Sequence, residues 1–322
     1  MTVDVPRRRA LNVPRSPLWL AASLVVLFSL ASVALQPTFL SPRVLQSNLS
    51  TFLPLMIIAV GQTYVILGGA IDLSLGALVS LVNVVLVTSL QALGADPSFA
   101  AIAACMGMAL LVGAAGGAVN GVLVGVLRLQ PIVSTFAAGI VFGGIALWIM
   151  PQAGGSMPPV YAKTYAAKLF GVKGATFMLL SLVAIIYLIS RTRFYIYLLA
   201  VGSNRPAAFQ SGLPVMRIRV LSYIVAGLFA SVTAMVILAS TSAGDPLMGQ
   251  AFTLGSVSAV VLGGTALSGG AGSAIGSMLG AVLLGLINNV LFFAQLPFVY
   301  QTIVQGTIIL AALAGGIMVS RR

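Results

Sequence analysis

The chain has few charged residues, no histidine, no glutamate and a single cysteine. Charged residues make up 6% of its 322 residues, against about 25% in soluble domains. The missing histidine and glutamate exclude histidine acid–base chemistry, most zinc sites and glutamate pairs. Cys105 alone forms neither an intrachain disulfide nor a cysteine-rich metal site. Because it lies in an apolar run, we expect it to act as a small buried hydrophobe.

Nucleotide-binding and nucleic-acid-binding signatures are also missing. No stretch fits the G-x-x-x-x-G-K-[ST] spacing of a P-loop, and 171–174 (GVKG) does not satisfy it. The formal net charge is +12, but no long basic stretch is interleaved with aromatic residues, as in nucleic-acid-binding segments. The sequence therefore predicts no enzyme activity, no cofactor and no nucleic-acid partner for this chain.

Apolar residues dominate what is present, at 60% of the chain with a mean hydropathy of +1.13. Such a chain has too little polar surface for water, so we expect membrane lipid around it. A span needs about 20 apolar residues. We therefore predict an all-α polytopic membrane protein with about ten spans, forming one transmembrane domain over 17–322 after a cytoplasmic segment, 1–16. The expected spans are 17–35, 51–68, 73–93, 99–127, 131–150, 175–190, 219–240, 250–267, 272–294 and 298–318.

The positions of the basic residues predict the orientation, because lysine and arginine concentrate in cytoplasmic loops. With the N-terminus inside, an even number of spans also returns the C-terminus to the inside. The outside then holds Arg43, Lys163, Lys168 and Lys173. The inside holds the other twelve of the 16 basic residues: Arg7, Arg8, Arg9, Arg15, Arg128, Arg191, Arg193, Arg205, Arg217, Arg219, Arg321 and Arg322.

Two connections between the expected spans are long. The first, 151–174, is predicted outside and carries three prolines, two of them at 158 and 159, and three lysines. The second, 191–219, is predicted inside and is basic, with prolines at 206 and 214. A long polar inner loop in such an apolar chain is either a docking surface for a cytoplasmic partner or a solvated linker.

Glycines form two further patterns. Residues 65–70 (VILGGA) resemble 261–266 (VLGGTA), which indicates either a weak repeat of two parallel halves or chance similarity between glycine-rich apolar segments. Glycines four residues apart share one helix face and let two helices pack closely. Such faces are expected in two spans, at Gly113, Gly117, Gly121 and Gly125 and at Gly272, Gly276 and Gly280.

Asp72 is the one acidic residue in a long apolar stretch and follows the pair Gly68 and Gly69. A carboxylate at membrane depth costs several kcal/mol and must face protein, water or a cavity. The glycines loosen the helix, and Asp72 with Ser74 is suited to accept the freed N–H groups of the next helix. Three interpretations remain open: a structural cap, a turn that shapes a pathway, or a titrating proton or ion site.

Three segments together resemble one family. Residues 69–76 (GAIDLSLG) resemble the G-G-I-D-L-S-x-G segment of bacterial ABC-importer permeases of the ribose, xylose and arabinose type. Residues 200–212 (AVGSNRPAAFQSG) resemble that family's coupling segment, A-x-G-x-N-x-x-A-A-x-x-S-G. Residues 261–270 (VLGGTALSGG) resemble its V-L-G-G-T-x-L-x-G-G segment. The resemblance runs from about residue 45 to the C-terminus, and the three motifs occur in the family's order.

The resemblance implies a multi-pass permease subunit in a bacterial inner membrane, with both termini cytoplasmic. Its implied partners are a second permease subunit (identical or related), cytoplasmic ATP-binding subunits and an extracytoplasmic solute-binding protein. Pro206 stands where many ABC permeases have glutamate, so an ion pair there is in doubt, although proline suits a first helical turn. The ATPase coupling residues carried over are Gly202, Asn204, Arg205, Ala207, Ala208 and Gly212. The expected pathway or structural turns are at Gly68, Gly69, Asp72, Ser74, Gly263 and Gly264, of which Gly68 precedes the matched segment 69–76.

We therefore expect import of a monosaccharide or similar small polar solute, driven by ATP hydrolysis on a partner. The alternative is a proton- or ion-coupled secondary transporter that uses Asp72, and a third class is a passive channel or scaffold. The loop 191–219 favours the ATP-driven importer, because neither a carrier nor a channel needs a docking helix.

Overall fold

The computed structural model describes residues 18–166, 168–169 and 172–297, and beyond them 300, 303, 304, 306, 307 and 310. Over these residues the chain is helical apart from turns and one two-stranded antiparallel hairpin. The elements are α1 Leu18–Leu35, α2 Pro42–Leu67, α3 Leu75–Ala92, α4 Phe99–Gly121, the π-helix η1 Val122–Val126, α5 Pro131–Ile149, α6 Pro159–Ala166, β1 Lys168–Leu169, β2 Val172–Lys173, α7 Gly174–Ser190, α8 Arg193–Ser203, α9 Arg205–Gln210, α10 Val215–Thr241, α11 Gln250–Leu262 and α12 Ala274–Phe293.

The all-α polytopic fold is confirmed, and nine of the ten expected spans coincide with helices. By length and hydropathy, seven helices of the described part can cross a membrane, or eight if α7 and α8, bent by 72°, count as one span. Three expected spans are not among the seven: 175–190, which passes only as α7 joined to α8, 250–267 and 298–318. The run 250–267 is only 13 residues long as α11, and 298–318 falls mostly outside the described residues. The segment 1–16 and Arg321 and Arg322 also lie outside them.

Helix starts follow the sequence. The hydroxyl of Ser98 accepts the N–H of Ala101 at 3.2 Å, and Ser273 accepts that of Gly276 at 3.0 Å. Each serine therefore satisfies an N–H that the first turn of its helix leaves free. Pro131 occupies the first position of α5, where its missing N–H has no cost. α2 begins at Pro42, nine residues before the expected 51. The sequence prediction started late because the polar residues of 46–51 lower the local hydropathy, although they do not interrupt the helix.

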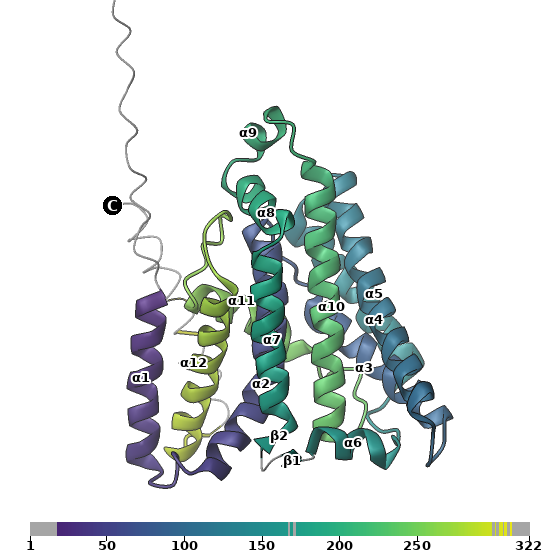
Figure 1. The fold of residues 1–322 in the computed structure, drawn as a ribbon, viewed down its shortest axis with the longest axis vertical. Helices are drawn as coiled ribbons and strands as arrows, with labels where there is room; N and C mark the ends of the chain where they lie inside the picture. The colour runs from purple at the N-terminus through teal and green to yellow at the C-terminus, as the bar shows by residue number, and fades with distance from the viewer. Residues whose placement is uncertain are drawn as a thin grey trace, which may run out of the picture.

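The helices form one bundle with two different ends (Figure 1). α8 and α9 lie at one end, which we call the α9 end, and α6 with the β1–β2 hairpin lies at the other, the α6 end. α2 and α10 are the long central helices, mostly buried, whereas α1 packs on α12 at one side and is largely exposed. The predicted loop 191–219 is therefore mostly helical, and α10 begins inside it at Val215.

The glycine face of α4 packs directly against α10. A Cβ on Gly113 would meet backbone atoms of Gly227, and one on Gly117 would meet those of Tyr223. On Gly121 a Cβ would lie 2.9 Å from Val220 Cα. In the second predicted face, Gly276 and Gly280 pack against Gly263 and Ala259 of the α11 side. Gly272 does not belong to that helix face: it precedes α12 with φ 144° and lies against Thr265.

A non-helical segment, residues 242–249, explains the shortness of α11. It starts at the α6 end, where Gly154 and Gly244 form a β-bridge, and then follows α3 into the bundle. The N–H of Asp245 donates to Asn83 Oδ1 at 3.0 Å, and the N–H of Gly249 donates to Ser80 Oγ at 2.9 Å. Side chains of α3 thus satisfy backbone groups that water cannot reach in a membrane.

Candidate functional site

The segment predicted to couple to a partner forms a short exposed helix. Asn204 ends α8 with φ −155° and ψ 95°, and its Oδ1 accepts the N–H of Ala207 at 3.0 Å, which caps α9. Pro206 lies in the first turn of α9, where no backbone N–H is required. Gly212 ends the motif with φ 76°, a conformation that glycine adopts without strain.

α9 projects beyond the rest of the bundle (Figure 1). Asn204, Arg205, Ala207 and Gly212 are exposed. Phe209 is 72% exposed, an unusual state for a large aromatic side chain, whereas Ala208 is buried against the core. α9 is therefore anchored by one small residue and presents a charge and a ring to its surroundings.

Four glycines bring α8 into contact with the two glycine-rich segments 69–76 and 261–270. The Cα of Gly202 packs so tightly that an added Cβ would meet Leu67 O and lie 2.6 Å from Gly270 N. A Cβ on Gly269 would lie 2.7 Å from Gly69 Cα. The N–H of Gly270 donates to the carbonyl of Leu67 at 3.0 Å. We call Gly69, Gly202, Gly269 and Gly270 the glycine junction; it brings all three family-like segments together beside α9.

The two glycine pairs end their helices with the same turn. At the end of α2, Gly69 N–H donates to Ile66 O at 2.8 Å and Ala70 N–H to Val65 O at 3.3 Å. At the end of α11, Gly264 N–H donates to Val261 O at 2.9 Å and Thr265 N–H to Val260 O at 3.1 Å. Both sets are the Schellman pattern, and Gly69 and Gly264 have φ of 74° and 82°. The shared turn pairs residues 65–70 with 260–265, one residue earlier than the predicted match 261–266, so the two glycine pairs have the same local structure in a shifted register.

Asp72 lies in a separate buried network beyond the first of these turns. It is fully buried, and its Oδ1 accepts the N–H of Ser74 at 2.8 Å and the Ser74 hydroxyl at 2.7 Å. Asn120 Nδ2 of α4 donates to Ser74 Oγ at 2.6 Å and lies 3.3 Å from Asp72 Oδ2. The Asp72 carboxylate therefore accepts hydrogen bonds from Ser74 within the turn. The Ser74 side chain makes no capping hydrogen bond to the first turn of α3.

Neighbouring helices hold the same turn through its backbone. In the orientation that satisfies its amide, Gln62 donates to Asp72 O at 3.2 Å and accepts from Asp72 N at 3.3 Å. Thr135 of α5 accepts the N–H of Leu73 at 3.0 Å. Side chains from α2, α4 and α5 thus fix the non-helical residues 70–74, and the described residues include no cation paired with the carboxylate.

Gln62, Asn120 and Thr135 were missed as site residues in the sequence. Isolated polar residues inside apolar runs were the available signal, because a polar group in a span needs a protein partner. Arg219 was placed in the inner loop, which is wrong: it lies in α10, is 4% exposed, and donates to Val124 O of η1 at 3.1 Å. Cys105 is buried, as expected.

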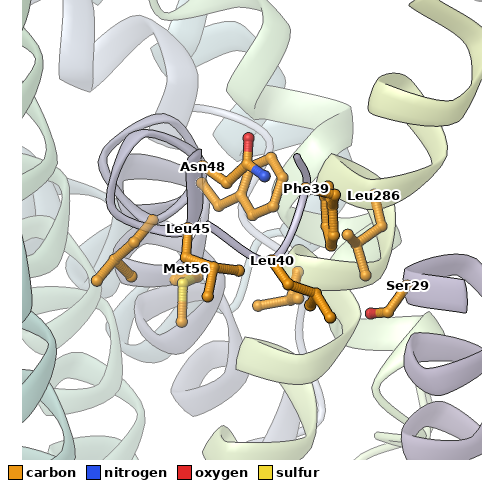
Figure 2. Close-up of a pocket in the computed structure, with 10 residues that line it drawn as sticks. Ser29, Phe39, Leu40, Leu45, Asn48, Met56 and Leu286 are labelled. Atoms are coloured by element: carbon orange, nitrogen blue, oxygen red, sulfur yellow. The ribbon is translucent and has the colours of Figure 1, made fainter. Parts of the chain in front are cut away.

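One cavity of about 260 Å³ lies between α1, α2 and α12. Its lining is apolar except for Ser29 and Asn48, and Figure 2 shows the Asn48 amide among leucine, phenylalanine and methionine side chains. The Asn48 oxygen already accepts from Asn289 Nδ2 at 3.2 Å. Asn48 Nδ2, which has no partner among the described residues, and Ser29 are the polar groups that this cavity offers to a solute.

Comparison with known proteins agrees with the three motifs. The family model described as the permease component of branched-chain amino acid transport systems matches residues 44–313. The ribose import permease protein RbsC of Escherichia coli (strain K12) is 35% identical over 300 residues, covering 90% of each chain. RbsC of Bacillus subtilis (strain 168) is 33% identical over 297 residues, covering 90% of this chain and 89% of the relative.

A third relative is the L-arabinose ABC transporter permease protein AraH of Azospirillum brasilense. It is 30% identical over 299 residues, which cover 89% of this chain and 84% of the relative. No solved structure matches the chain. The family match covers most of the chain, and these relatives align over nearly their whole length, so the chain belongs to the family of permease components that includes ribose and arabinose import permeases.

Proposed function

We propose that this chain is the membrane subunit of an ATP-driven importer that carries a monosaccharide or a similar small polar solute into the cytoplasm. The relatives named for ribose and arabinose support the class of solute. ATP hydrolysis takes place on partner subunits. The α9 end then faces the cytoplasm of a bacterial inner membrane, together with both termini.

The glycine junction is the observation that carries this proposal. An ATP-binding subunit that docks on α9 moves α8, and Gly202 of α8 packs without a side chain between Leu67 and Gly270. Movement of α8 therefore displaces two segments at the same time: the turn that ends α2 and the loop that follows α11. Packed interfaces of this kind shift between discrete arrangements rather than deforming continuously. Gly68, Gly263 and Gly264, beside these turns, are the positions at which the bundle reshapes a pathway.

The charge of the α9 end indicates the chemistry of the groove on the ATP-binding subunit that would bind α9. Its exposed charged residues among those described are arginines, at Arg128, Arg191, Arg193, Arg205 and Arg217. The position where related segments carry glutamate is Pro206, so α9 offers no carboxylate. The groove is therefore acidic near Arg205 and apolar where it receives Phe209.

The remaining partners follow from the two other surfaces. A solute-binding protein docks at the α6 end, outside the cell. A second permease subunit, identical or related, packs against exposed apolar helix faces of the bundle, since a pathway between two subunits needs both. Membrane lipid covers the rest of those faces.

Two variants test the docking role of α9. Arg205→Glu reverses its charge, and Gly212→Leu places a side chain at φ 76° and distorts its last turn. Both are expected to lose co-purification with the ATP-binding subunit and ATP-dependent uptake in proteoliposomes, with normal membrane insertion. Arg43→Glu, an exposed residue at the start of α2 and so at the α6 end, is the matched charge control and is expected to retain co-purification. Normal uptake in both α9 variants would show that the docking site lies elsewhere.

A secondary carrier is the competing function, because Asp72 is a buried carboxylate without an ion pair in the described part of the chain. Uptake by the chain alone, driven by a pH gradient and abolished in Asp72→Asn, would establish the carrier and exclude the ATP-driven mechanism. We expect no such uptake by the chain alone.

A further inference from the structure

Two buried polar atoms near Asp72 have no hydrogen-bond partner among the described residues. They are Oδ1 of Asn120 and the hydroxyl of Tyr223, and both residues are fully buried. Buried polar atoms in folded proteins are nearly always paired with protein or with ordered water. Two such atoms in the part of the bundle that holds a buried carboxylate therefore point to a ligand.

The packing of α4 on α10 brings these groups to the same place. Asn120 follows Gly117 by three residues on α4, and Gly117 packs on the backbone of Tyr223. Tyr223 belongs to the same buried cluster as Ala70 and Leu75, which flank Asp72 in the sequence. Asn120 already uses Nδ2 on Ser74 Oγ at 2.6 Å. The carboxylate of Asp72, the amide oxygen of Asn120 and the phenol hydroxyl of Tyr223 thus lie in one buried region of the bundle, where α3, α4 and α10 pack together.

The donor and acceptor count selects the ligand. Asp72 Oδ2 has only the 3.3 Å contact with Asn120 Nδ2, so it can accept a further hydrogen bond, and Asn120 Oδ1 can accept as well. The Tyr223 hydroxyl can donate. A small molecule that donates to the two oxygens and accepts from the phenol satisfies all three groups. Water has this capacity in full, and a sugar hydroxyl has it in part.

We propose that Asp72, Asn120 and Tyr223 form a buried site for a hydroxyl-bearing ligand, which is either a water molecule or a hydroxyl group of the transported sugar. The site joins the non-helical turn 70–74 to α4 and α10 through its ligand. Its existence does not depend on the proposed transport role; only the sugar as its source rests on that role.

Removing single hydroxyl groups tests the site. Tyr161 provides a matched control, because it is also buried and its hydroxyl donates to Met235 O at 3.1 Å. In the purified chain in mixed micelles, Tyr161→Phe is expected to lower the folding equilibrium constant by about three- to tenfold, since it removes a buried hydrogen bond. Tyr223→Phe is expected to lower it by a similar factor, because its hydroxyl bonds a ligand.

The opposite result overturns the proposal. If Tyr223 faces a dry interior, Tyr223→Phe removes an unsatisfied hydroxyl and leaves the folding equilibrium constant unchanged or raised, while Tyr161→Phe still lowers it. An experimental density map gives a second reading. Density within hydrogen-bond distance of all three groups, lost in Tyr223→Phe, supports the site, and its absence from the unaltered protein excludes it.

Ribose uptake by the assembled transporter identifies the source. A KM for ribose that rises severalfold in Tyr223→Phe and stays unchanged in Tyr161→Phe assigns the ligand to the sugar. An unchanged KM together with the loss of stability assigns it to water. A transporter that does not take up ribose refutes that choice of solute and leaves the stability result standing, so the two failures are distinguishable.

Discussion

The closest backbone approach at the glycine junction makes Gly202→Ala the most informative single change. The new Cβ would lie 2.6 Å from Gly270 N and 2.9 Å from the carbonyl carbon of Leu67. Backbone must therefore move, and overpacking of this kind costs about 1–3 kcal/mol. Separating Leu67 from Gly270 also lengthens their 3.0 Å hydrogen bond, which contributes about 1 kcal/mol. The better helix propensity of alanine returns about 1 kcal/mol, leaving a net loss of about 1–3 kcal/mol.

Two assays separate stability from coupling in this variant. The free energy of unfolding is measured by denaturant titration in mixed micelles, and ATP-driven uptake is measured at equal amounts of folded protein. Gly144→Ala in α5 is the matched control, because a Cβ there meets nothing within 4 Å, and it is expected to be neutral or slightly stabilising. We expect Gly202→Ala to reduce uptake severalfold while the partner still binds α9. If Gly202→Ala behaves like Gly144→Ala in both assays, the junction does not transmit motion.

Two further changes test local packing. Asn204→Ala removes the cap on the N–H of Ala207 and is expected to cost α9 about 1 kcal/mol, seen as weaker binding of the ATP-binding subunit in a titration; unchanged binding would show that α9 is held by other contacts. Gly117→Val places a side chain against the backbone of Tyr223 and is expected to reduce the yield of folded protein, whereas Gly107→Val, where a Cβ meets nothing within 4 Å, is expected to fold normally. Equal yields of the two valine variants would contradict the close packing of α4 on α10.

The helices were predictable from the sequence because hydropathy depends on local composition. Runs such as 131–150 and 272–294 need no knowledge of their neighbours, and α5 and α12 match them within a few residues. The half-length α11 was not predictable in this way. Residues 242–249 follow α3, where Asn83 and Ser80 accept the N–H groups of Asp245 and Gly249, and sequence separations of 162 and 169 residues hide that pairing.

The candidate site shows the same division between local and distant information. The short helix after Asn204 and the turn at Gly69 follow from local residue types, since a cap and a left-handed glycine are local requirements. The convergence of Gly202 with Gly69 and Gly270 depends on how three distant segments pack. Likewise, Asp72 was recognisable as an isolated carboxylate, but its contact with Asn120 depends on the packing of α4.

The short α11 also has a consequence for biosynthesis. At 1.5 Å per residue, its 13 residues reach about 20 Å, less than the ~30 Å hydrocarbon core. Such a segment cannot leave the translocation machinery and partition into lipid by itself, because the preceding residues 242–249 would expose unpaired backbone groups. We therefore expect it to insert only after α3 is in place, together with α12, on which it packs. Because α3 precedes α11 in the chain, it is synthesised first and is already present to accept the N–H groups of the segment 242–249.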